Sequence, residues 1–169
     1  MNASPVPDGY ATVTPWIVTR DTARVIEFIE AAFDGREIDR VSLEDGSIGH
    51  AEVRIGDSVV MLFDAKDNWP ETPALLRLFV ADVDAVFRQA LRAGAVVITE
   101  LRSHPWGDRV GRVRDPLGNI WWLQQRVEVV DADEMNRRWS LPKYIENMRY
   151  TQDSLDRELS SRTLPPTSG

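Results

Sequence analysis

The sequence contains no cysteine, which excludes a disulfide framework, a thiolate metal site and a cysteine nucleophile. Histidine is also scarce and occurs only at His50 and His104. No apolar run approaches the roughly 20 residues that a membrane-spanning helix needs. The first residues carry neither the charged region nor the apolar region of a signal peptide. We therefore expect a cytoplasmic protein that has no membrane partner.

Positive charge is in deficit, because 20 lysines and arginines stand against 27 aspartates and glutamates, for a net charge of −7. A protein that binds a phosphate backbone needs a basic face, so this balance argues against a nucleic-acid partner. The G-x-S-x-G motif, the P-loop and the dinucleotide fingerprint are absent as well. What remains is a chain of 169 residues with 43% hydrophobic content, enough for one domain with a core.

The two halves of the chain show the same order of elements, βαβββ. In the first half, apolar periodicity and turn residues predict a strand at 13–18, a helix at 22–33 capped by Asp21, a strand at 36–43 and a hairpin of 48–55 with 58–63. In the second half the same reasoning predicts a strand at 75–80, a helix after the cap Asp82, and strands at 96–101, 109–114 and 119–124.

The offset between the halves is constant, which indicates a duplicated unit. The helix caps Asp21 and Asp82 lie 61 positions apart, and so do Met61 and Trp122. We therefore expect a flexible N-terminus at 1–11 and a domain at 12–126, divided into units 12–64 and 74–126 by a linker at 65–73. C-terminal helices at 127–160 and a disordered tail at 161–169 follow.

The C-terminal helices carry an apolar stripe that needs a surface to cover. Its members are Leu141, Ile145, Met148, Leu155 and Leu159. Packing on the same subunit and docking across a dimer explain the stripe equally well.

Three motifs carry a resemblance to a known family. They are residues 49–58 (GHAEVRIGDS), residues 106–109 (WGDR) and residues 111–119 (GRVRDPLGN), the last with a turn in which proline and glycine have defined conformational roles. With the paired βαβββ units, residues 12–126 resemble the vicinal-oxygen-chelate (glyoxalase/bleomycin-resistance/dioxygenase) superfamily, and the motifs resemble its PhnB-like branch. This resemblance implies an α+β fold in which two repeats form a cup-shaped mixed sheet, usually completed in a homodimer. The C-terminal helices are an extension of that fold.

Enzymes of this superfamily usually bind a divalent metal at four positions that face the cup. The resemblance places these positions at Thr14, Met61, Leu75 and Trp122. Divalent metals require His, Glu, Asp or Gln at such places. We therefore expect neither a metal site of the usual kind nor another cofactor.

Strand alternation predicts the residues that line the cup. His50 and Glu52 are the candidate catalytic pair, although a structural histidine and an internal ion pair explain them as well. The candidate ligand-binding residues are Trp16, Arg54, Met61, Phe63, Arg77, Phe79, Trp106, Trp122 and Gln124. Arg77 is suited to clamp an anionic group or to pair with Glu52. We expect Arg109, Arg112 and Arg114 to be solvated residues of an outer strand.

These features favour a metal-independent protein that binds an aromatic or hydrophobic small molecule in the cup, with a resistance or sequestration role. The alternative is a PhnB-like enzyme of the lyase, isomerase or dioxygenase class that uses His50 and Glu52 as an acid–base pair. Glyoxalase or dioxygenase chemistry through the usual metal is disfavoured, because its ligands are missing. A structural dimeric module with the C-terminal helices as its interaction surface is a further reading.

Overall fold

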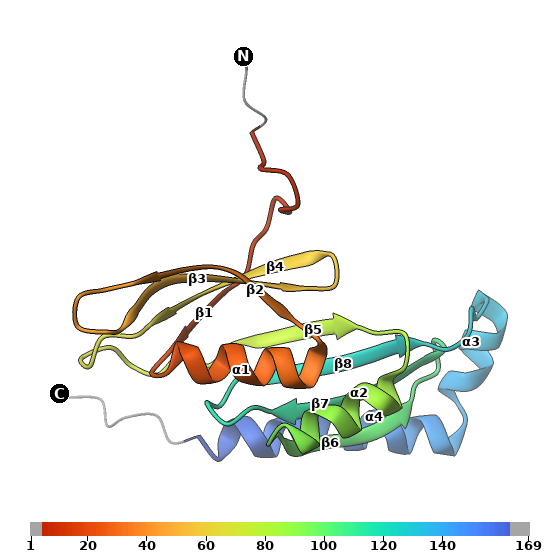
Figure 1. Cartoon of the computed structure of the whole chain (residues 1–169). Helices are drawn as coiled ribbons and strands as arrows, with labels where there is room; N and C mark the ends of the chain where they lie inside the picture. Colours follow the sequence, from red (N-terminus) through yellow and green to blue (C-terminus); the bar gives the residue numbers. More distant parts are fainter. Residues whose placement is uncertain (1–4, 163–169) are drawn as a thin grey trace.

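The computed structural model describes residues 5–162, and Figure 1 shows two similar halves followed by C-terminal helices. The first half consists of β1 (Trp16–Thr19), α1 (Thr22–Phe33), β2 (Arg36–Ser42), β3 (Ile48–Ile55) and β4 (Ser58–Asp64). The second consists of β5 (Leu75–Phe79), α2 (Val83–Arg92), β6 (Val96–Ser103), β7 (Asp108–Arg114) and β8 (Ile120–Arg126). Two helices follow, α3 (Ala132–Trp139) and α4 (Pro142–Ser160). The predicted α+β fold with two βαβββ units and a helical extension is confirmed.

The helices start where the sequence places them. The Asp21 side chain accepts a hydrogen bond from the Arg24 amide at the start of α1, and Asp82 accepts one from the Ala85 amide at the start of α2. Each aspartate thereby satisfies one of the amides that the first turn of a helix leaves without an intrahelical partner. Residues 1–4 and 163–169, which include most of the predicted disordered tail, lie outside the described residues.

Each half forms a four-stranded mixed sheet with the same topology. The strand orders are β1-β4-β3-β2 and β5-β8-β7-β6, and the first pair in each sheet is parallel. In the parallel pairs Trp16 lies beside Met61, and Arg77 lies beside Trp122. Of the predicted metal positions, Thr14 precedes β1, and Leu75 lies in β5 beside Ile120. Residues two apart along a strand share a face, so Leu75 lies on the same face of β5 as Arg77.

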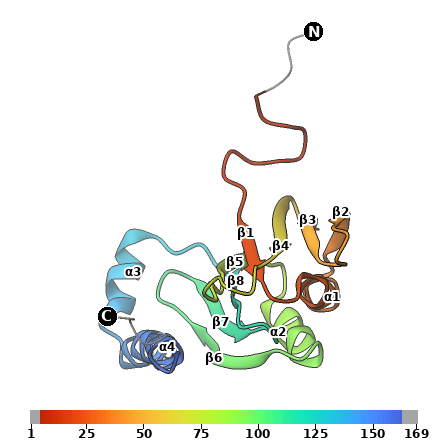
Figure 2. The ribbon, with the colours of Figure 1, turned by 90° about the vertical axis from the view of Figure 1, so that its left-hand side faces the viewer.

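One face of both sheets packs on a single shared core. The core joins α1 and α2 to apolar residues of both sheets, among them Ile17, Leu62 and Leu123. Trp121 of β8 is fully buried and lies 4.8 Å from Phe33 of α1, measured between ring centroids. Figures 1 and 2 show α1 and α2 side by side, on the same side of the two sheets. The opposite faces of the sheets therefore point away from the core.

The C-terminal extension covers part of the second sheet. Helix α4 packs on β6 of its own chain, on the side opposite to α2 (Figure 2). Its buried residues are Tyr144, Thr151 and Ser154, whereas Ile145 and Leu159 of the predicted apolar stripe stay exposed. The stripe is thus only part of the face that α4 buries: Met148 and Leu155 are half-buried beside Thr151 and Ser154. No helix among residues 5–162 is long and apolar enough to span a membrane.

Candidate functional site

The first sheet presents an aromatic surface with a polar row beside it. Trp16, Met61 and Phe63 lie on the face opposite to α1, together with His50, Glu52 and Arg54; we call these six residues the first-sheet face. The Trp16 ring stands edge-on to Phe63 at 5.4 Å and to His50 at 5.6 Å between centroids. Trp16 remains 46% exposed, which leaves its ring available to a further molecule.

Glu52 makes the central hydrogen bonds of the polar row. It accepts a short hydrogen bond from the Tyr10 hydroxyl, and its other oxygen lies 3.0 Å from His50 Nε2. The hydrogen bond from Tyr10, helped by His50, lowers the pKa of Glu52, so this carboxyl stays ionised. Arg54 donates to the Gly9 carbonyl at 3.3 Å. The internal pair that competed with a catalytic role of Glu52 therefore forms with His50 and not with Arg77.

Tyr10 belongs to a stretch that we expected to be flexible, and sequence reasoning missed it. A phenol three residues before the predicted strand carries no pattern, because its partner Glu52 is 42 positions away. Only the folded chain brings the two side chains together.

The second sheet carries a stack of two guanidinium groups on one indole. The Arg77 guanidinium carbon lies 4.3 Å from the centre of the Trp122 ring, and that of Arg112 lies 3.8 Å from it. Both distances are within the range of a cation–π interaction. We call Arg77, Trp122 and Arg112 the Arg–Trp–Arg stack. Arg77 is exposed at the edge strand, whereas Trp122 is half-buried.

The prediction that Arg112 is a solvated residue was wrong, since it is 2% exposed. Its Nη1 donates to the Thr99 hydroxyl at 3.1 Å and to the Thr151 carbonyl of α4 at 2.7 Å. Burial, and next to it the charge of Arg77, lowers the pKa of Arg112 to about 10, which leaves it protonated at neutral pH. The register of the hairpin could have placed Arg112 beside Trp122, but the helix that covers it comes from a distant segment.

Two further predicted ligand-binding residues, Trp106 and Gln124, are engaged in a buried cluster around Asp108. Gln124 donates a short hydrogen bond to Asp108, and Trp106 Nε1 donates to the same oxygen at 3.0 Å. Gln124 is 5% exposed, and Trp106 packs on His104 and Trp139. The structure thus brings Gln124 and Trp106 together, away from open solvent, and joins neither to the Arg–Trp–Arg stack by a hydrogen bond.

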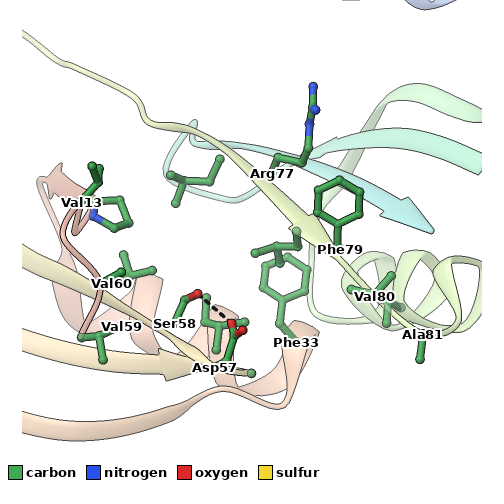
Figure 3. A pocket seen from close by; sticks show the side chains of 17 residues that line it. Val13, Phe33, Asp57, Ser58, Val59, Val60, Arg77, Phe79, Val80 and Ala81 are labelled. Atoms are coloured by element: carbon green, nitrogen blue, oxygen red, sulfur yellow. Dashed lines mark hydrogen bonds between the residues drawn. The ribbon is translucent and has the colours of Figure 1, made fainter. Parts of the chain in front are cut away.

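The two faces do not meet within one chain. No hydrogen bond, ion pair or ring contact between described residues joins the first-sheet face to the Arg–Trp–Arg stack or to Phe79, which is 65% exposed. A groove of about 550 Å³ does open between the halves, on the core side. Figure 3 shows Val60, Phe33 and Val80 around it, with the Arg77 side chain directed away from these residues. Of the predicted site residues, only Arg77 and Phe79 line this groove.

One known family model matches this chain. Residues 9–123 match the model of the Glyoxalase/Bleomycin resistance protein/Dioxygenase superfamily. The chain belongs to this superfamily. The resemblance in the sequence motifs is thereby confirmed, and structural neighbours include PhnB-like proteins.

Relatives support the superfamily and show how far the shared region extends. An uncharacterized protein of Mycobacterium tuberculosis is 42% identical over 139 residues, which cover 76% of this chain and 82% of that protein. TioX from Micromonospora sp. ML1 has a similar structure with a TM-score of 0.57 and 24% identity, over 72% of this chain and 100% of TioX. A PhnB protein from Bacillus cereus gives a TM-score of 0.57 at 20% identity, over 68% of this chain and 99% of its own. At these identities the two structures show the fold alone.

The residues present do not fit the divalent metal that members of the superfamily usually bind. The positions that the resemblance assigns to metal ligands hold Thr14, Met61, Leu75 and Trp122, and the residues in register with Met61 and Trp122 are Trp16 and Arg77. A thioether, two indoles, an aliphatic side chain and a cation supply no ligand for a hard or borderline ion, and one hydroxyl cannot hold such an ion alone. Within residues 5–162 no group of three or more His, Asp or Glu side chains is arranged to hold a metal.

Proposed function

We propose that this member of the glyoxalase/bleomycin-resistance superfamily binds an aromatic or hydrophobic small molecule without a metal. The observation that carries the proposal is that Trp16, Met61, Arg77 and Trp122, in register on the first and fourth strands of the two halves, offer aromatic, thioether and cationic groups and no metal ligand. Aromatic walls with a few oriented polar groups are typical of small-molecule sites. A resistance or sequestration role follows from binding alone and needs no reacting group.

The binding cup in this proposal forms between two copies of the chain. The first-sheet face and the Arg–Trp–Arg stack point away from the shared core, so one chain does not enclose a ligand between them. Both faces also expose large apolar side chains, with Trp16 at 46%, Leu75 at 51% and Phe79 at 65%. Clustered apolar exposure of this kind marks interaction surfaces. A homodimer that sets the first-sheet face of one copy against the stack of the other covers both.

The first experiment tests ligand binding in the dimer. Light scattering is expected to give a dimer, and titration with aromatic compounds is expected to quench tryptophan fluorescence. Trp16→Ala should weaken the best ligand about tenfold, because the substitution removes an aromatic wall. The matched control is Trp139→Ala: Trp139 is 44% exposed, lies on α3 and contacts no residue of the first-sheet face. A monomer that binds no aromatic compound would contradict the proposal.

The same experiment includes the addition of divalent metals, with the thermal midpoint of unfolding as the readout. Added Mn²⁺, Ni²⁺ or Zn²⁺ is expected to leave the thermal midpoint unchanged, because a bound metal would stabilise the folded state by mass action. Stoichiometric binding of one metal with a raised midpoint would contradict the metal-independent proposal.

A second candidate function rests on the hydrogen-bonded row of Tyr10, Glu52 and His50. An ionised carboxylate that fixes one nitrogen of an imidazole leaves the other nitrogen to exchange a proton with a substrate. If the protein turns over a carbonyl compound, His50→Gln should lower kcat by about 100-fold or more, the usual contribution of a general acid–base group. Tyr10→Phe should retain most of the activity, since His50 keeps its bond to Glu52. Turnover that is the same in His50→Gln and in the native chain would remove this candidate.

A further inference from the structure

The two arginines of the Arg–Trp–Arg stack have no acidic partner among the described residues. Arg77 makes no hydrogen bond or ion pair, and Arg112 donates only to the uncharged oxygens of Thr99 and Thr151. The chain as a whole carries an excess of acidic residues, so a carboxylate near these groups would be the ordinary arrangement.

Neighbouring arginines show this ordinary arrangement. Arg109 and Arg114, on the same strand as Arg112, pair with Asp84 at 2.8 Å and with Glu158 at 3.3 Å. Arg126 of β8 lies 3.5 Å from Asp108. The missing counter-charge is therefore local to Trp122 and is not a general property of the second sheet.

Two buried donors of the stack are also unsatisfied. Arg112 Nε and Trp122 Nε1 are inaccessible to solvent and have no hydrogen-bond partner in the described part of the chain. A buried donor without a partner costs about 1–3 kcal/mol, and a buried charge without a counter-charge costs more. Two like charges beside one ring add repulsion, and burial with the charge of Arg77 lowers the pKa of Arg112. A bound anion beside the stack would supply the missing counter-charge and offset the repulsion between the two arginines.

Glu52, the carboxylate of the first-sheet face, is not free to serve as this counter-charge. Glu52 lies opposite Met61 in the first hairpin, as Arg112 lies opposite Trp122 in the second. Both oxygens of Glu52 are already engaged, one by Tyr10 and the other by His50. Its side chain is 14% exposed and is held within its own sheet.

We propose that the Arg–Trp–Arg stack binds the acidic group of an organic anion whose apolar body lies against Trp16 in the dimeric cup. This inference rests on the small-molecule site proposed above and names the class of its ligand. The planar fork of a guanidinium matches the paired oxygens of a carboxylate or a phosphoryl group. Thr151 of α4 closes one side of Arg112, so the anion reaches the stack from the side of the exposed Arg77.

A pair of fluorescent probes that differ in one charged group tests this inference. Anilinonaphthalene sulfonate and the neutral N-phenyl naphthylamine share the aromatic body, and only the first carries an acidic group. We expect the full-length dimer to bind the sulfonate about tenfold more tightly than the neutral probe, the range of hydrogen bonds to charged groups. Competition by naphthoate and by naphthyl phosphate then distinguishes a carboxylate ligand from a phosphoryl ligand.

Two variants assign the effect to the stack. Arg77→Gln should remove the preference for the sulfonate, because it weakens binding of the charged probe much more than binding of the neutral probe, and Arg77→Lys should retain part of the preference. Arg77 is exposed and makes no hydrogen bond, so these variants are expected to fold. Arg88→Gln on α2 is the control, because Arg88 is exposed and its loss changes the net charge equally. Changing Arg112 is avoided, because that side chain is buried.

The possible failures are distinguishable. Equal affinity for both probes, or a sulfonate preference that persists in Arg77→Gln, would overturn the anion site while the proposed small-molecule site stands. Failure of the dimer to bind either probe would overturn both proposals. A loss of preference in Arg88→Gln as large as that in Arg77→Gln would show a net-charge effect and would also reject the stack as the site.

Discussion

Asp115→Ala is expected to lower the free energy of unfolding by about 3–5 kcal/mol, since each buried donor that loses its partner costs about 1–3 kcal/mol. The Asp115 side chain is 3% exposed and organises the turn between β7 and β8. One oxygen accepts from the amides of Leu117 and Asn119, both at 2.9 Å. The other accepts from Asn119 Nδ2 at 2.8 Å and from Trp121 Nε1 at 3.1 Å. Trp121 is fully buried, so its indole N–H has no access to water as a substitute.

The duplicated hairpin supplies the matched control for this substitution. Asp57 occupies the turn between β3 and β4, but it is exposed, and its side chain accepts only from Ser58 at 2.9 Å. Asp57→Ala is expected to change stability by less than about 0.5 kcal/mol, as exposed sites do. Urea unfolding at a fixed protein concentration measures both variants, because a dimer's stability depends on concentration. Similar losses in the two hairpins would contradict the role assigned to Asp115.

Stability is expected to fall by about 3 kcal/mol as the pH drops from about 6.5 to about 4, because of His104. His104 is 2% exposed and lies in the loop after β6, against α4. Its Nδ1 is 3.2 Å from Met148 Sδ, and its Nε2 is 3.2 Å from Thr151 Oγ1. Burial and then the charge of Arg112 lower the pKa of His104 to about 4, against a smaller opposing effect of Asp108.

The direction of this change in stability follows from proton binding in the folded and unfolded states. In the unfolded chain His104 binds a proton below about pH 6.5, whereas in the folded chain it binds one only below about pH 4. Between these two pH values the unfolded state binds more protons, so acid favours unfolding. Above the window both states are neutral at His104, and below it both are protonated, so the effect reaches a plateau at each end. The control is His104→Gln, which cannot be protonated and should give a flat profile between pH 6.5 and the range in which carboxylates titrate. An equally steep profile in His104→Gln would refute the assignment.

Sequence reasoning was most successful where the information is local or periodic. The aspartate caps, the Asp-Pro-x-Gly-Asn turn and the alternation of the hairpins follow from the conformational preferences of neighbouring residues, and the structure has them where they were predicted. The repeat made the second half a check on the first. The sequence did not predict the register of the parallel pairs, because the partner strand is distant along the chain and no turn fixes it.

The strand faces and residue types of the candidate site were predictable from the sequence, whereas its long-range contacts were not. Alternation placed Trp16, Met61, Arg77 and Trp122 on the correct faces, and the lack of metal ligands depends on residue type alone. The hydrogen bond from Tyr10 to Glu52 and the burial of Arg112 under Thr151 join segments at least 39 positions apart. Such contacts leave no periodic trace in the sequence.

The buried face of the C-terminal helix α4 was also set by a partner that is distant along the chain. The apolar stripe predicted the buried face of α4 only in part: Met148 and Leu155 are half-buried, whereas Ile145 is exposed. The fully buried residues include Thr151 and Ser154, because the sheet beneath offers the Thr99 hydroxyl at 2.7 Å from Ser154. Hydrophobic periodicity presumes an apolar partner and misses the polar residues that a polar partner can satisfy.

The sequence by itself determined the duplicated fold, the superfamily and the loss of metal-ligating residues, because these depend on local conformational preference and on side-chain chemistry. Only the tertiary structure decided that both faces point away from the shared core and that two arginines without counter-charges meet on one indole. Those facts depend on how a shared core orients the sheets and on which distant helix covers them, and both are set by long-range packing.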